Sequence, residues 1–197
     1  MKDLIKHIDE IGRNKVGMVT GHRPPALFPN LDDADNAYSR ENFEWLVAFA
    51  LHALVKLTAR HQIELWLTGG ALGWDLAWAR ACQLEQVPYA MCLPHRNHGS
   101  NWVSFQDTLE YLCADAEFVH LVTDASYSAR LMQVRNEFMV NNSRLYVALW
   151  NGNQFGGTYN CVRYIQSVAA RLKGDGEDFR FYSLWNSWIK IQQEATK

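Results

Sequence analysis

Residues 144–174 read RLYVALWNGNQFGGTYNCVRYIQSVAARLKG, and this stretch contains the unit from which the fold can be predicted. It begins with an unbroken apolar run at 145–150, which is typical of a strand buried on both faces of a parallel sheet. Glycines and asparagines interrupt the run, and an amphipathic helical pattern then resumes at 158–174. A strand, a glycine-rich turn and a helix in this order predict one βα unit of an α/β sheet.

Similar units fill the rest of the chain. Strands are predicted at 16–20, 63–68, 88–93, 117–122, 144–150 and 179–184, the last of them at an edge. Helices are predicted at 36–60, 73–86, 102–116, 129–143, 158–174 and 185–193. The alternation predicts an α/β fold, namely a single Rossmann-like three-layer domain over residues 1–197 with a mostly parallel sheet of five or more strands.

The charge and apolar content of the chain indicate which kinds of binding partner to expect. A formal net charge of −2 and a pI of about 6.4 lack the basic excess typical of nucleic-acid-binding proteins, so nucleic acid is not the expected partner. The four cysteines show no CxxC spacing and are expected to be reduced and buried. Because there is neither a signal-peptide pattern nor an apolar run long enough to span a membrane, we expect a cytoplasmic protein without a membrane partner.

Glycines and polar residues follow the predicted strands, at the sheet edge where open α/β proteins bind ligands. A glycine loop that enters a helix directs unpaired N–H groups at an anion, and glycine leaves room for a phosphate. Arg23 and Arg96 can each hold a phosphate with two hydrogen bonds, and Asp75 can accept one from a ribose or a base. The candidate ligand-binding residues are Gly21, His22, Arg23, Gly69, Gly70, Gly73, Asp75, Asn151, Gly156, Gly157 and Thr158.

These residues also have structural explanations. A Gly-Gly pair after a strand is more often a turn than a phosphate site, and Asp75 near the start of a helix complements the helix dipole. His95 and His98 resemble a metal-ligand pair, but no third ligand accompanies them. We therefore expect no metal and no cofactor.

Three motifs resemble the SLOG superfamily, the Rossmann-like group that includes the LOG phosphoribohydrolases and the DNA-processing protein A fold. They are VTGHRPPAL at 19–27, LTGGALGWDLAWA at 67–79 and RNEFMVNNSRLYVALWNGNQFGGTYNCVRY at 135–164. The resemblance extends over about 16–163 and is closest to the YspA/YpsA-like branch, many of whose members are bacterial or phage-borne.

The resemblance implies a nucleotide or nucleotide-derived ligand at the strand ends. Arg135 stands at the position of the arginine in the arginine–lysine pair of the LOG enzymes, and Asn136 stands at the position of the lysine. Both therefore join the candidate ligand-binding residues. The remaining correspondences are Gly21 with the first glycine turn, Gly69, Gly70 and Gly73 with the second, and Gly156, Gly157 and Thr158 with the end of the phosphate-binding loop.

One departure from the LOG pattern affects the expected activity. Acidic residues follow the phosphate loop in those hydrolases, whereas this chain has Tyr159, Asn160 and Cys161. Because cleavage of an N-glycosidic bond needs an acid or base beside the bond, binding without catalysis is the first expectation. Asp75 is the candidate catalytic residue if the chain is an enzyme, and Asp124 and Glu137 are the other carboxylates considered.

Three functions follow from these observations. The first is a sensor or sequestering module for a nucleotide or nucleotide-derived ligand. The second is a hydrolase or phosphoribohydrolase that cleaves an N-glycosidic or phosphate bond of a nucleotide. The third is single-strand nucleic-acid binding, in which tryptophans would stack on bases if exposed, although core packing is favoured for them. Those tryptophans are Trp74, Trp78, Trp102 and Trp150.

A homodimer is also possible from the sequence. The helix predicted at 36–60 carries a long apolar face, and this face suits either a second subunit or the core of the same chain.

Overall fold

The computed structural model describes residues 3–28, 36–123 and 128–195. Within these residues six strands form one sheet in the order β4-β3-β2-β1-β5-β6, and each neighbouring pair is parallel. The strands are β1 (Val16–Gly21), β2 (Leu65–Thr68), β3 (Tyr89–Leu93), β4 (Phe118–Leu121), β5 (Leu145–Leu149) and β6 (Arg180–Ser183). The predicted α/β class is therefore confirmed, and the sheet is wholly parallel.

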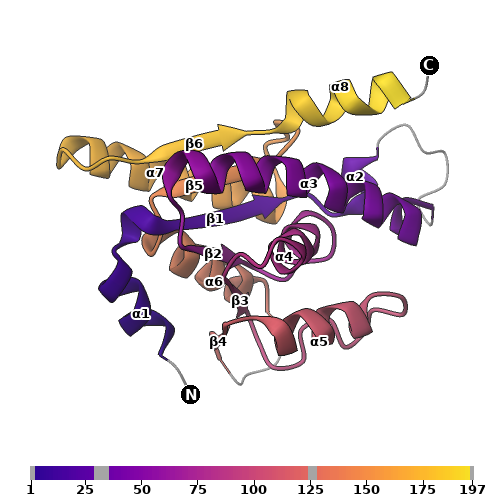
Figure 1. Cartoon of the computed structure of the whole chain (residues 1–197), viewed down its shortest axis with the longest axis horizontal. Helices are drawn as coiled ribbons and strands as arrows, with labels where there is room; N and C mark the ends of the chain where they lie inside the picture. Colours follow the sequence, from indigo (N-terminus) through magenta and orange to yellow (C-terminus); the bar gives the residue numbers. More distant parts are fainter. Residues whose placement is uncertain (1–2, 29–35, 124–127, 196–197) are drawn as a thin grey trace.

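Helices cover both faces of this sheet (Figure 1). They are α1 (Leu4–Ile11), α2 (Pro24–Leu27), α3 (Arg40–His61), α4 (Trp74–Leu84), α5 (Gln106–Asp115), α6 (Ala129–Asn141), α7 (Gly156–Gly174) and α8 (Trp185–Ala195), with 3-10 turns η1 (Arg13–Lys15) and η2 (Asn36–Tyr38). Helices α3, α4, α5 and α8 contribute to one apolar cluster, and α1, α6 and α7 contribute to another. The result is a three-layer Rossmann-like architecture.

The central strands are apolar on both sides because both faces of the sheet are covered. In β5, Leu145, Val147 and Leu149 pack in the cluster that contains α3 and α4, whereas Tyr146 packs in the cluster that contains α6 and α7. All four side chains are at most 2% exposed. This explains why the sequence of the strand shows no alternation of polar and apolar residues.

Three predicted helix starts are wrong by two residues or more. The helix predicted at 36–60 begins at Arg40, because Ser39 caps it by accepting a hydrogen bond of 3.2 Å from the Asn42 N–H. The helix predicted at 102–116 begins only at Gln106. The helix predicted at 158–174 begins at Gly156, so the paired glycines belong to its first turn.

The apolar face of α3 packs inside the chain. Leu46, Ala50 and Leu54 are at most 1% exposed and belong to the same cluster as residues of α4. The structure thus gives this face an intramolecular role, and a homodimer stays a prediction without support from α3.

Helix α8 packs against the end of α2. Trp188 Nε1 and Gln192 Nε2 donate hydrogen bonds of 2.7 and 2.9 Å to the Leu27 carbonyl oxygen, at the end of α2. The Trp188 ring is fully buried and contacts Phe28 and Phe49. None of the helices in the described residues combines the length and the apolarity needed to cross a membrane.

Candidate functional site

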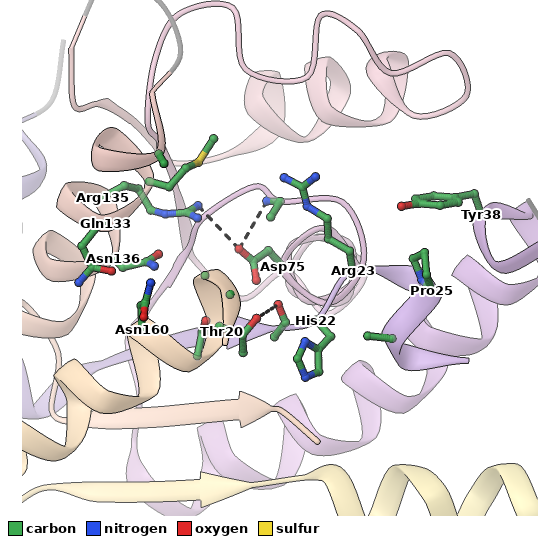
Figure 2. Close-up of a pocket in the computed structure, with 18 residues that line it drawn as sticks. Thr20, His22, Arg23, Pro25, Tyr38, Asp75, Gln133, Arg135, Asn136 and Asn160 are labelled. Carbon is green, nitrogen blue, oxygen red and sulfur yellow. Dashed lines mark hydrogen bonds and ion pairs between the residues drawn. The ribbon is translucent and has the colours of Figure 1, made fainter. Parts of the chain in front are cut away.

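A cavity of about 690 Å³ lies at the carboxyl ends of β1 and β5. These strands are neighbours in the sheet, although β2, β3 and β4 separate them in the chain. The strand order therefore reverses between them, and this reversal is where open α/β sheets form their binding crevice. Figure 2 shows the side chains that line the cavity.

The amino end of α7 forms one wall of the cavity. Gly156, Gly157 and Thr158 line it, and the side chain of Phe155, the N-cap residue, makes no capping hydrogen bond. The first-turn N–H groups have no partner within the helix, so they are available to an anion. Thr158 Oγ1 donates a hydrogen bond of 2.9 Å to the Gly21 carbonyl oxygen and so ties this end of α7 to β1.

A buried ion pair lies at the centre of the cavity wall. Arg135 Nη1 on α6 is 3.7 Å from Asp75 Oδ2 on α4, and Asp75 Oδ2 also accepts a hydrogen bond of 3.4 Å from the Ala71 N–H. Burial raises the pKa of Asp75 to about 6, and the opposing effects of Arg135 and the Ala71 N–H are smaller. Asp75 thus titrates near neutral pH.

Arg135 is partly unsatisfied in this position. It donates from Nη1 to the Gly69 carbonyl oxygen, but its buried Nε has no hydrogen-bond partner among the described residues. A buried N–H without a partner is rare, and a ligand oxygen would satisfy it. The side chain lines the cavity and is only 7% exposed.

Several other residues predicted to bind a ligand line the same cavity as Asp75 and Arg135. The lining includes Gly21, His22, Arg23 and Asn136, together with Asp75, Arg135 and the α7 residues. Tyr38, Gln133 and Asn160 also line it, and sequence reasoning did not assign a ligand-binding role to any of the three. Figure 2 shows Gln133, Asn136 and Asn160 together on the side of α6 and α7, with Tyr38 on the opposite side.

The glycines that follow β2 do not line the cavity. A Cβ on Gly69 would collide with Arg135 Nη1, so a side chain at this position has no room beside the guanidinium group. Gly73 has a φ of +105°, and its Cβ would lie 2.8 Å from the His22 carbonyl oxygen. The Gly70 carbonyl oxygen accepts a hydrogen bond of 3.0 Å from His98 Nε2. Gly69 and Gly73 therefore lie next to Arg135 and His22, which line the cavity, without lining it themselves.

Asn151 also lies outside the cavity lining and positions a residue that belongs to it. His22 Nε2 is 2.7 Å from Asn151 Oδ1, and the same oxygen accepts a hydrogen bond of 3.0 Å from the Asn153 N–H. The Asn151 N–H also donates a hydrogen bond of 3.2 Å to His22 Nε2, so contacts with Asn151 join the loops that follow β1 and β5. Burial lowers the pKa of His22, and the hydrogen bond with Asn151 opposes this in part.

Glu137, another candidate carboxylate, does not line the cavity. Glu137 Oε1 accepts a hydrogen bond of 3.0 Å from Gln133 Nε2 and does not belong to the lining, and Asp124 lies outside the described residues. Asp75 is therefore the acidic residue that lines the cavity within the described part of the chain. Asn160 lines the cavity, whereas Cys161 is fully buried, and burial raises the pKa of its thiol to about 12.

The histidine pair, His95 and His98, and two of the tryptophans have places in the fold that explain them without a ligand. His98 contacts the His95 and Trp102 rings, and burial is the main reason that its pKa falls to about 4. Within the described residues no three His, Cys, Asp or Glu side chains are grouped as metal ligands. Trp74 and Trp78 are fully buried, which confirms their predicted place in the core.

Comparisons with known proteins agree with this architecture. A family model described as the YspA SLOG family matches residues 18–175. DNA processing protein A from Streptococcus pneumoniae has a similar structure, with a TM-score of 0.50 and 10% identity over 88% of this chain and 60% of that one. This chain therefore spans less than two thirds of that protein. None of the curated proteins compared with the chain matches it.

Two further solved structures are similar. DNA processing protein A from Helicobacter pylori, which binds single-stranded DNA, gives a TM-score of 0.51 and 12% identity over 96% of this chain and 84% of that one. The structure named TM1055 gives a TM-score of 0.48 and 13% identity over 90% of this chain and 98% of that one. At these identities the likeness to DNA processing protein A concerns the fold.

Proposed function

Since the chain belongs to the YspA SLOG family, we propose that its cavity binds a nucleotide or a nucleotide-derived phosphorylated ligand, as a sensor or sequestering module. One observation supports this proposal most strongly: two sets of hydrogen-bond donors that lack protein partners belong to the same cavity wall. The amino end of α7 and the side chain of Arg135, whose buried Nε has no hydrogen-bond partner among the described residues, line the same cavity at the switch point of the sheet.

The electrostatics favour an anionic ligand. Two guanidinium groups, Arg23 and Arg135, line the cavity with one carboxyl group, Asp75, among the described residues. The dipole of α7, a helix of 19 residues, adds a positive potential at its amino end, and no acidic side chain occupies its first turn. A phosphate placed there would exchange hydrogen bonds from water for hydrogen bonds from the first-turn N–H groups of α7. It could approach the backbone closely at Gly157, which has no side chain.

The size and remaining chemistry of the cavity suit more than a bare phosphate. Its volume of about 690 Å³ lies within the usual range for small-molecule sites. Asp75 can accept a hydrogen bond from a sugar hydroxyl, and the side-chain amides of Asn136, Gln133 and Asn160 can donate and accept. Polar groups of both kinds in one cavity are what a nucleotide requires.

A melting-temperature screen tests this proposal. The panel contains nucleoside 5′-mono-, di- and triphosphates, and the unphosphorylated nucleosides serve as controls. A ligand at a hundred times its Kd stabilises the folded chain by about 2.7 kcal/mol, which raises the melting temperature by several degrees. We expect at least one phosphorylated compound to do so while its nucleoside does not. If no phosphorylated compound raises the melting temperature, the proposal is wrong.

Hydrolysis of the bound nucleotide is a second candidate function, and the environment of Asp75 favours it. With a pKa raised to about 6, Asp75 exchanges protons near neutral pH, as a general acid or base must. Its Oδ2 is held by Arg135 and the Ala71 N–H, so the carboxyl group is fixed in orientation. The bond cleaved would be an N-glycosidic or a phosphate bond.

The hydrolase candidate has its own test. The protein is incubated with the nucleotides that bind, and the released base and phosphate are measured by chromatography. Asp75→Asn keeps the size of the side chain and removes its ability to transfer a proton. Release by the wild type that Asp75→Asn abolishes supports catalysis, whereas binding without release leaves the sensor or sequestering function.

Single-stranded nucleic acid is the less favoured ligand. Trp74 and Trp78 cannot stack on bases because both are fully buried, although Trp102 and Trp150 are partly exposed, and the net charge of −2 gives no overall attraction to a polyanion. Salt-sensitive retention of the protein on single-stranded DNA would contradict this conclusion.

A further inference from the structure

The chemistry of the cavity changes from one end to the other. Figure 2 shows Asn160, beside the amino end of α7, and Tyr38 at opposite sides, with Asp75 between them. The α7 side offers backbone N–H groups and side-chain amides. The opposite side, which η2 and α2 provide, offers the Tyr38 ring and the apolar surfaces of Pro25 and Ala26.

Tyr38 has the properties of a stacking platform. It is the one Phe, Tyr or Trp among the described residues that line the cavity. Its ring is half-buried and packs against the apolar cluster that includes α3 and α4, so its position is fixed from one side. Figure 2 shows the side chain extending from η2 toward the cavity with its hydroxyl group leading. An aromatic side chain at this end suits an aromatic ring of the ligand, which can pack on its face or against its edge.

We propose that the ligand lies with its phosphate on the amino end of α7, its sugar beside Asp75 and an aromatic base against Tyr38. This inference rests on the proposed function and adds to it an orientation and a residue that determines specificity. Tyr38 selects for ligands that carry a base, whereas the α7 end binds the phosphate of any such compound.

The opposite orientation is less favourable for the same groups. A phosphate near Tyr38 could reach Arg23, but it would face Pro25 and Ala26 and would leave the N–H groups of α7 without an anion. A base at the α7 end would cover these N–H groups with a ring that offers few acceptors to them. Arg23 lies between Asp75 and Tyr38 in Figure 2, so it can contact the sugar or the edge of the base in the proposed orientation.

Calorimetric titration with two kinds of probe tests the orientation. The probes are the four common ribonucleoside 5′-monophosphates and ribose 5-phosphate, which has the sugar and phosphate but no base. Tyr38→Leu removes the aromatic ring and keeps an apolar side chain against the core. Tyr111→Leu is the matched control, because Tyr111 lies on α5, outside the cavity lining, and is 59% exposed.

We expect at least one nucleotide to bind the wild type more tightly than ribose 5-phosphate does. Tyr38→Leu should weaken that nucleotide by about fivefold to a hundredfold, the usual range for loss of one base–aromatic stack, and leave ribose 5-phosphate unchanged. Tyr111→Leu should change neither, and unchanged melting temperatures of both variants without ligand would show that they fold.

Two results overturn the inference in different ways. If ribose 5-phosphate binds as tightly as every nucleotide, or if Tyr38→Leu weakens both kinds of probe equally, Tyr38 does not recognise a base, although the phosphate site survives. If neither kind of probe binds the wild type, the proposed function and this inference fail together.

Discussion

Arg135 Nη1 lies 3.7 Å from Asp75 Oδ2, and the two side chains are only 7% and 5% exposed. They come from α6 and α4, on opposite faces of the sheet, and meet beyond the ends of its strands. Breaking such a buried pair leaves an uncompensated charge, so both partners contribute to folding as well as to the site.

Arg135→Gln should therefore destabilise the protein. The substitution removes the partner of Asp75 and the donor to the Gly69 carbonyl oxygen, and we expect a loss of about 3 kcal/mol in the free energy of unfolding. Urea denaturation measures it. Arg130→Gln, at an exposed position of the same helix, is the control and should change stability by less than about 0.5 kcal/mol. Equal losses in both variants would contradict the role of the pair.

Asp75 should also make stability depend on pH. Its pKa of about 6 in the folded state exceeds the ordinary aspartate value of 3.8, so the folded chain holds this proton more tightly than the unfolded chain. The stabilisation is complete below about pH 4 and is lost as the pH rises through about 6. The stability of the wild type minus that of Asp75→Asn should fall by about 2 kcal/mol between pH 4 and 7, measured by urea denaturation. A difference that stays constant or rises over this range would show that the pKa is not raised.

Asn160→Asp tests the sign of the ligand charge. The substitution preserves size but adds a negative charge to the cavity wall beside the amino end of α7. Repulsion should weaken a phosphorylated ligand about tenfold, measured by calorimetric titration at low salt, and added salt should reduce the difference. Asn160→Ser, which loses the amide without adding charge, should weaken it less. Equal affinity for the Asn160→Asp protein and the wild type would place the phosphate elsewhere.

Trp188→Phe should weaken the link between the carboxyl-terminal helix and the cavity rim. The change removes one of two donors to the Leu27 carbonyl oxygen and leaves a small void in the core. We expect a loss of about 2 kcal/mol in the free energy of unfolding. Ligand affinity should also fall, because α2 carries Pro25 and Ala26 of the lining. Wild-type stability and affinity in this variant would show that α8 does not support the site.

The sequence predicted the fold well because burial on both faces leaves a strong signal. The apolar strands and the amphipathic helices between them specify parallel βα units, and the rule for open α/β sheets then locates the binding edge. His22, Asp75 and Gly157 were placed at this edge by their position after strands, and the structure brings them to one cavity.

Tertiary contacts explain what the sequence could not predict. Gly69 suggested a close ligand, but the space beside it is filled by Arg135, which is 66 residues away in the chain. Tyr38 and Gln133 follow no predicted strand, so no local pattern connected them with the site. The start of α7 was placed after the glycines because glycine is a poor helix former, whereas the first turn accepts it readily.

The measurement that tests the central claim most directly is a calorimetric titration of two valine variants of α7 with the nucleotide that most raises the melting temperature. Gly157 and Gly174 are both exposed, lack a positive φ and have no atom within 4 Å of an added Cβ, so both substitutions fit the fold. Helical side chains point toward the amino end, and valine at 157 would therefore occupy the place of the phosphate. The account predicts that Gly157→Val lowers affinity at least about a hundredfold while Gly174→Val binds like the wild type. Wild-type affinity in a folded Gly157→Val protein would contradict it.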